Sequence, residues 1–135
     1  MTIGNIVITD KKRSEDDQMN QSNIIMKRIS PESLNSLSRV ITEKISDSGA
    51  ELIFQDLQKG PDTEVLLLVF EKYYLRTGSY TALTVQCTSS GNIQRAAVVG
   101  TGGGSGLFNL SFGSNESFAQ TAKKILEACG FEEDQ

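Results

Sequence analysis

The sequence predicts one α+β domain of two layers, an antiparallel meander of five to six strands with two helices on one face. Its 135 residues suit a single domain of ordinary size. Two segments repeat apolar residues at helical spacing, whereas the segments around them alternate with a period of two. Short links rich in turn residues separate these segments, so neighbouring strands are expected to pair antiparallel.

The two ends of the chain are expected to lie outside this domain. Residues 1–23 predict a flexible tail, because the stretch DKKRSEDDQMNQSN holds one methionine, no aromatic residue and almost nothing to bury. Within that tail, Ile3–Ile8 fits either a short strand or a segment ordered only by its neighbours. Residues 131–135 predict an acidic C-terminal tail, which leaves residues 24–130 as the domain.

The domain is predicted to begin with an edge strand over Ile24–Ile29, followed at once by a helix. Ser30 is suited to the N-cap of that helix and Pro31 to its first helical position. Ile29 and Leu34 have the spacing of a hydrophobic staple, in which an apolar residue before the cap packs on the first turn.

Each predicted helix has an apolar stripe and a glycine at its end. The first is expected to end at Gly49, and its stripe consists of Leu34, Leu37, Ile41 and Ile45, widened by Val40. The second is expected to begin with Ser114 or Asn115 as the N-cap and to end at Gly130. Its stripe consists of Phe118, Ala122, Ile125, Leu126 and Cys129.

Five further strands are predicted between the two helices. Val65–Tyr74 is apolar on both alternations and is expected inside the sheet, while Tyr80–Thr88 alternates with Leu83, Val85 and Cys87 on one face. The other three are Leu52–Leu57, Ile93–Val99 and Leu107–Phe112. The order β-α-β-β-β-β-β-α is closest to TATA-binding-protein-like and helix-grip architectures, an analogy that carries no function.

Charge disfavours nucleic acid as a partner. The net charge is −4, and residues 31–135 hold 8 of the 13 basic but 13 of the 17 acidic side chains. A domain of this sign repels a phosphate backbone. The longest apolar run, VLLLVF, is too short to span a membrane, and the N-terminus places apolar residues before charges, opposite to a secretory signal. We therefore expect a cytoplasmic protein.

The glycine-rich stretch Val98–Phe108 (VVGTGGGSGLF) raises the possibility of a phosphate-binding loop. Neither the dinucleotide spacing nor a Walker lysine is present, and an alternating strand rather than a helix follows. The glycines instead predict positive φ, a bulge or a close approach of a helix to the sheet. A ligand-admitting loop is the other interpretation, with these speculative binding residues: Gly102, Gly103, Gly104 and Ser105.

Catalytic and metal chemistry find little support. The chain has no histidine, which removes the commonest general base and transition-metal ligand. Cys87 and Cys129 form no zinc motif and are interpreted as small buried hydrophobes. The acids around the turn at residues 56–64 lack the EF-hand pattern. We predict no catalytic residue, metal or cofactor, and hence a protein that is not an enzyme.

The segment FEKYYLRTG, Phe70–Gly78, is the most suggestive polar group. Tyrosine and arginine are enriched in protein interfaces, so Glu71, Tyr73 and Arg76 are candidate partner-binding residues. A cross-strand ion pair with ring packing at the end of a hairpin explains the same residues without a function. A third hypothesis makes them the acid, base and anion clamp of an enzyme.

Three features give a resemblance to a known family. They are VFEKY (Val69–Tyr73), GGS (Gly103–Ser105) before an aromatic strand, and a polar-capped helix with Phe118. With them, the chain resembles a family of small bacterial proteins known only as a domain of unknown function, over roughly Ile24–Leu126. The resemblance implies a bacterial cytosolic origin and brings no activity or cofactor.

Two functions remain open from the sequence. The first is a non-enzymatic interaction module that binds a protein partner or self-associates through a sheet face or edge. The second is a binder of a small apolar ligand, in a pocket between sheet and helices near the glycine-rich turn. Its expected lining is Phe108, Leu110, Leu83 and Ile125.

Overall fold

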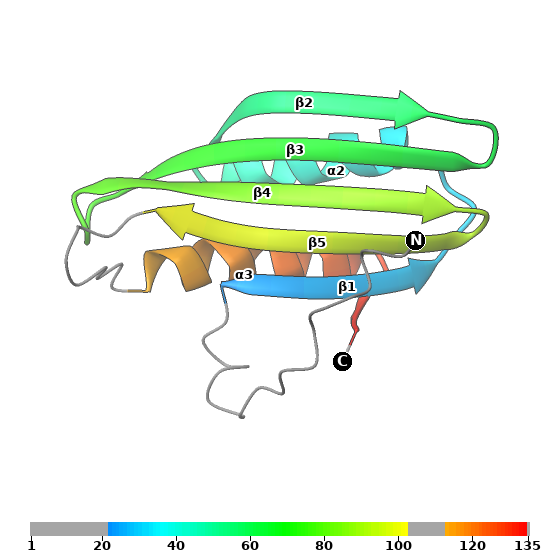
Figure 1. Ribbon diagram of the computed structural model, residues 1–135. Coiled ribbons are helices and arrows are strands. Elements are labelled where there is room, and N and C mark those ends of the chain that lie inside the picture. Colours follow the sequence, from blue (N-terminus) through cyan, green and yellow to red (C-terminus); the bar gives the residue numbers. More distant parts are fainter. Residues whose placement is uncertain (1–21, 103–112, 135) are drawn as a thin grey trace, which may run out of the picture.

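The structure is a computed structural model that describes residues 22–102 and 113–134. In those residues, six strands form one antiparallel sheet of order β2-β3-β4-β5-β1-β6, and two helices lie on one face of it (Figure 1). The predicted two-layer α+β fold is therefore confirmed. In chain order the elements are β1 (Asn23–Ile29), α2 (Leu34–Asp47), β2 (Glu51–Lys59), β3 (Thr63–Tyr74), β4 (Ser79–Ser90), β5 (Ile93–Gly102), α3 (Ser114–Ala128) and β6 (Glu132–Glu133).

The core lies between the sheet and the helices. Alternate residues of β3 and β4 point toward the helices and are fully buried. They are Leu66, Leu68, Phe70, Leu83, Val85 and Cys87. As predicted, β3 has a neighbour on each side, and the three apolar residues of β4 share one face. The intervening residues of both strands point to the opposite face, where no helix of the described residues lies (Figure 1).

Helix α2 begins three residues later than predicted. Its N-cap is Ser33, whose Oγ accepts from the amide of Asn35 at 3.0 Å. Ser30 instead extends the β1–β5 ladder, because its amide donates to the carbonyl oxygen of Asn92 at 2.8 Å. The predicted staple is also wrong, since Ile29 is 82% exposed. The apolar stripe of α2 is buried as predicted, apart from the exposed Val40. Gly49 follows the helix with a left-handed backbone φ of 98°.

Helix α3 has no side-chain cap of the predicted kind. Its N-cap is Gly113, which adopts a left-handed φ of 83° and makes no side-chain capping bond. Ser114 is the first helical residue, and its buried Oγ accepts from Thr81 Oγ1 at 3.0 Å. From the stripe, Phe118, Ala122 and Leu126 are fully buried, while Ile125 and Cys129 pack partly buried against them.

The chain returns to the sheet after α3, where the sequence predicted a solvated tail. Phe131 is buried, and Glu132–Glu133 pair with the middle of β1. An ion pair of 2.9 Å joins Lys123 to Glu133. Residues 131–134 therefore belong to the domain, and β1 has a neighbour on both sides instead of forming the edge. The physical reason is Phe131, whose burial holds the segment against the sheet.

The sequence predicted that a helix approaches the sheet closely at the glycine-rich stretch. This approach occurs at Gly100, the first glycine of the stretch. A Cβ on Gly100 would collide with the backbone carbonyl of Asn115, so α3 sits against β5 only because Gly100 has no side chain. Gly102 ends β5 with a φ of 86°. The predicted strand Leu107–Phe112 and the N-terminal segment Ile3–Ile8 lie outside the described residues.

Candidate functional site

The candidate site is the face of the sheet that α2 and α3 leave uncovered, called the open face below. Register places on it alternate side chains from five strands, β2, β3, β4, β5 and β1. Within the described residues these side chains are partly or fully exposed, and no helix packs on them. Apart from two tyrosines, its apolar members are Ile25, Ile29, Phe54, Val65, Leu67, Val69, Ala82, Ile93, Ala97 and Val99.

A continuous row of side chains crosses the centre of the open face. Phe54 pairs with Val69, Val69 with Thr84, and Thr84 with Val99, so four neighbouring strands contribute one residue each. Phe54 is 52% exposed and Val99 38%. The next row runs from Asp56 through Leu67 and Gln86 to Ala97 and Ile25, so polar side chains interrupt the apolar surface there.

Two tyrosines form one corner of the open face. Tyr73 and Tyr80 are direct partners on β3 and β4, and their rings meet edge to face with centroids 5.1 Å apart. About half of each side chain remains exposed, 47% for Tyr73 and 57% for Tyr80. Tyrosines held in this way present apolar area together with a hydroxyl, as many interface residues do.

Charged side chains are divided between the two sides of the open face. The acids Glu51, Asp56 and Glu71 stand on β2 and β3. The bases Lys27 and Arg95 stand as direct partners on β1 and β5. Between them, β4 carries no charged residue anywhere along its length. Lys27 forms an ion pair of 3.4 Å with Asp134 and stands opposite Glu132 on β6, so a neutral strand separates an acidic side of the open face from a side of mixed charge.

The three hairpin residues singled out from the sequence do not form one cluster. Glu71 and Tyr73 lie on the open face, two residues apart on β3. Arg76 lies in the following turn and reaches toward Gly113 at the start of α3. There its positive charge acts on Tyr74. Burial raises the pKa of the Tyr74 hydroxyl, and the guanidinium of Arg76 opposes this shift because it favours the charged form. The acid, base and clamp of the enzyme hypothesis are therefore split between two faces of the sheet.

The other predicted site residues are less informative. Gly102 is exposed at the end of β5, and Gly103, Gly104 and Ser105 lie outside the described residues. Of the expected pocket lining, Leu83 is fully buried in the core and Ile125 is partly buried against it. Phe108 and Leu110 fall in the undescribed segment.

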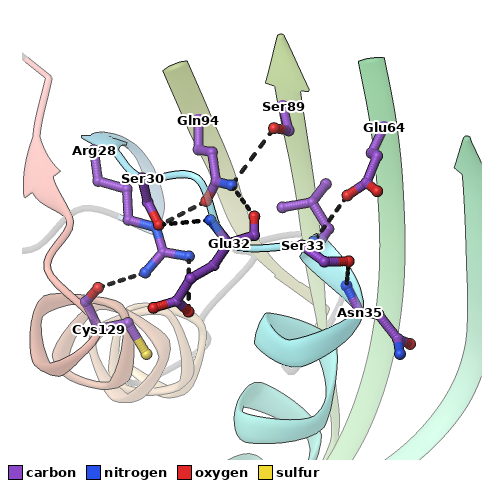
Figure 2. Close-up of polar contacts among 10 residues, drawn as sticks. Arg28, Ser30, Glu32, Ser33, Asn35, Glu64, Ser89, Gln94 and Cys129 are labelled. Carbon is purple, nitrogen blue, oxygen red and sulfur yellow. Dashed lines mark hydrogen bonds and ion pairs between the residues drawn. The ribbon is translucent and has the colours of Figure 1, made fainter. Parts of the chain in front are cut away.

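Sequence reasoning missed a polar cluster around Arg28, shown in Figure 2. The side chain of Arg28 is only 7% exposed. Its Nε donates to Gln94 Oε1 at 2.8 Å and its Nη1 to the carbonyl oxygen of Cys129 at 2.6 Å, while its guanidinium lies 4.7 Å from the ring centroid of Phe131. Gln94 in turn donates to the carbonyl oxygen of Glu32 at 2.7 Å.

This cluster is structural in character. It joins β1, β5, the link before α2 and the C-terminal end of α3 (Figure 2). A cation at the C-terminal end of a helix also complements the helix dipole. The Arg28 Nη2 nitrogen lies 4.0 Å from a Glu32 carboxylate oxygen and makes no hydrogen bond with the described residues. Hydrogen bonds within the domain therefore occupy most of these polar groups, which argues against a ligand site here. The contacts link residues 66 and 101 positions apart, so no local pattern in the sequence could indicate them.

The two thiols, Cys87 and Cys129, are both at least partly buried. Burial raises the pKa of Cys87 to about 12, against an opposing effect of Arg28, and burial likewise raises the pKa of Cys129. Neither thiol is therefore an activated nucleophile at neutral pH. Over residues 22–102 and 113–134, no group of three potential metal ligands comes together, and neither helix is long and apolar enough to cross a membrane.

Fold and site together define a small two-layer α+β domain with one helix-covered and one open sheet face. The chain belongs to a family of unknown function (DUF6054), whose pattern matches residues 23–130. This match confirms the resemblance to a domain of unknown function and covers the domain from β1 to the end of α3. Comparison with curated proteins gave no match, and neither did comparison with solved structures.

Proposed function

We propose that this domain is a non-enzymatic interaction module that binds protein through its open face. The observation that carries the proposal is the row Phe54–Val69–Thr84–Val99, where three apolar side chains and a threonine remain partly exposed across four strands. Large contiguous apolar patches are uncommon on monomeric proteins and mark interaction sites. The exposed tyrosine pair Tyr73 and Tyr80 adds the residue type that interfaces favour.

The size of the open face fits a protein partner. Five strands spaced about 4.8 Å apart and about ten residues long cover roughly 24 Å by 33 Å. That area, about 800 Å², is what one partner contributes to a standard protein interface. A small ligand would leave most of such a flat surface in contact with water.

The edges of the sheet support the proposal less well than its face. At one edge, β2 has a register shift between Leu52 and Phe54, and its remaining residues include Asp56 and Lys59. Bulges and charges at an edge oppose the addition of a further strand. At the other edge, β6 offers only the two residues Glu132–Glu133. Binding through strand addition is therefore disfavoured.

A protein partner also fits the chemistry of the open face better than a nucleic acid does. Glu51, Asp56 and Glu71 place negative charge on it, which repels phosphates. The free thiols of Cys87 and Cys129 suit a reducing compartment, so we expect the partner in the cytoplasm.

Site-specific photo-cross-linking in cells tests the proposal. A benzophenone side chain is placed at Thr84, in the centre of the open face, and for comparison at Arg39, exposed on α2. We expect protein adducts, to this chain or to another, from Thr84 and few from Arg39. Absence of adducts at Thr84, or equal yields at both positions, would contradict a role for the open face in binding.

A further inference from the structure

We infer that the segment of residues 3–13 of the same chain binds the β2–β3 side of the open face. Its sequence, IGNIVITDKKR, places three basic side chains after an apolar run. On the open face the segment competes with the protein partner for the same surface. This inference rests on the proposed function and adds to it a competing occupant that regulates access to the surface.

Two facing carboxylates mark the place of the basic residues. Glu51 and Glu71 are direct partners on β2 and β3, and both stand on the open face. Three ion pairs form within the described residues, and none of them includes either carboxylate. Like charges directly opposite each other destabilise a strand pair. Lys11, Lys12 and Arg13 supply the opposite charge, so their binding offsets part of this repulsion.

The part of the chain that the structure describes begins at the same end of the sheet as these acids. Ser22 extends the β1–β5 ladder, because its carbonyl oxygen accepts from the amide of Gly100 at 2.7 Å. The register carries this row from Gly100 across β4 and β3 to β2, one residue away from the row of Glu51 and Glu71. The preceding residues therefore join the sheet beside the row that holds the acids.

The length of the connecting segment allows this path. From β1, three strand spacings lead to β3 and four lead to β2, about 14 Å and about 19 Å. Arg13 precedes Ser22 by nine residues, which span up to about 30 Å when extended. The acids Glu15–Asp17 fall between them, over β4 and β5, whose residues in the row of the acids, Ala82 and Thr101, carry no charge.

The apolar residues of the segment reach the apolar row of the open face. Phe54 and Val69 lie two residues along β3 from Glu71, about 7 Å. Ile8 precedes Lys11 by three residues, about 10 Å of extended chain. The segment therefore covers Phe54, which is 52% exposed, once its bases lie over the acids. Its attachment to β1 gives a high effective concentration, so a modest contact suffices.

Photo-cross-linking of the purified full chain tests the inference. A benzophenone side chain is placed at Phe54 or, in a separate protein, at Arg95. Both positions are on the open face, about 20 Å and about 18 Å from Ser22, so a segment that does not bind reaches them almost equally. Denaturing electrophoresis separates adducts within one chain from adducts between two, and mass spectrometry identifies the captured peptide.

The inference predicts that Phe54 captures residues 3–13 of its own chain at least about fivefold more often than Arg95 does. Equal yields at the two positions would overturn the inference. Adducts of double mass at Phe54, without adducts inside one chain, would identify a second copy as the occupant and would also overturn it.

A charge exchange tests the contact between bases and acids. Lys11→Glu combined with Lys12→Glu should lower the yield at Phe54 to the level at Arg95. Adding Glu51→Lys and Glu71→Lys to the same protein should restore the yield, because the opposite charges again face each other. A yield that the first pair of substitutions leaves unchanged, or that the second pair does not restore, would overturn the assigned contact.

The same variant separates this inference from the proposed function. In cells, Lys11→Glu with Lys12→Glu releases the competitor, so adducts of Thr84 with other proteins should rise at least about threefold. An unchanged yield of those adducts would overturn the competition and leave the proposed function intact. Capture of residues 3–13 at Phe54, with no Thr84 adducts to any other protein in either background, would instead contradict the proposed function.

Discussion

Glu51 and Glu71 are direct partners across the β2–β3 ladder, so two carboxylates face each other on the open face. Like charges opposite each other in an antiparallel pair destabilise it. The pair therefore lowers the stability of the β2–β3 ladder.

Glu51→Lys tests this repulsion. It converts a like-charge pair into an opposite-charge pair, and we expect the free energy of unfolding to rise by about 0.5 kcal/mol. Urea denaturation measures the change. Glu43→Lys, on the exposed surface of α2, is the control and should leave the free energy of unfolding nearly unchanged. No rise for Glu51→Lys, or an equal rise for both variants, would contradict a repulsion between Glu51 and Glu71.

Arg28→Met tests the polar cluster that joins β1 to α3. The substitution removes the donors to Gln94 and to the Cys129 carbonyl, and it leaves Gln94 fully buried without its partner. We expect a loss of about 2–4 kcal/mol in the free energy of unfolding. Arg39→Met on α2, an exposed arginine, should cost less than about 0.5 kcal/mol. Equal effects of the two substitutions in urea denaturation would refute the structural role of Arg28.

Gly100→Ala tests the contact between α3 and β5. The added methyl group would collide with the Asn115 backbone, which cannot move without displacing the start of the helix. We expect a loss of about 1–3 kcal/mol in stability, measured by thermal unfolding. The neighbouring Thr101→Ala, at an exposed position, is the control and should be nearly neutral. Similar melting temperatures for both variants would show that the helix does not depend on this glycine.

The buried thiol of Cys87 predicts a pH dependence. Burial raises its pKa from the ordinary 9.0 to about 12, so the folded state holds this proton more tightly than the unfolded state does. Its contribution to stability is therefore complete below pH 9 and is lost as the pH rises toward about 12. The difference in unfolding free energy between the natural protein and Cys87→Ala should shrink over this range. A difference that stays constant with pH would contradict the raised pKa.

Much of the fold was accessible from the sequence because its signals are local. Helical spacing in α2 and α3 and alternation in β4 identified those elements and the residues they bury. Helix caps were less predictable. Ser30 and Ser33 are both suited to capping, and only the bond from the Ser30 amide to Asn92, which is distant in sequence, decides between them.

The open face could be predicted only in part. Val65, Leu67 and Val69 are apolar on the alternation opposite to the core, which indicated an interior strand but not which face the helices would cover. The division of charge depends on strand order, because β5 and β1 are adjacent in the sheet yet far apart in sequence. Lys27 and Arg95 become neighbours only through that pairing. The same holds for Phe131, whose burial depends on Arg28 and α3.

Photo-cross-linking from Thr84 in three backgrounds is the most direct test that the open face binds protein. The backgrounds are the natural chain, Leu67→Lys in the open face, and Arg39→Glu on α2. We predict protein adducts for the natural chain and for Arg39→Glu. Leu67→Lys should bind at least about 100-fold more weakly, because it places a charged side chain within the apolar part of the open face. A natural chain that gives no adducts, or a Leu67→Lys variant that gives as many as the natural chain, would contradict the account.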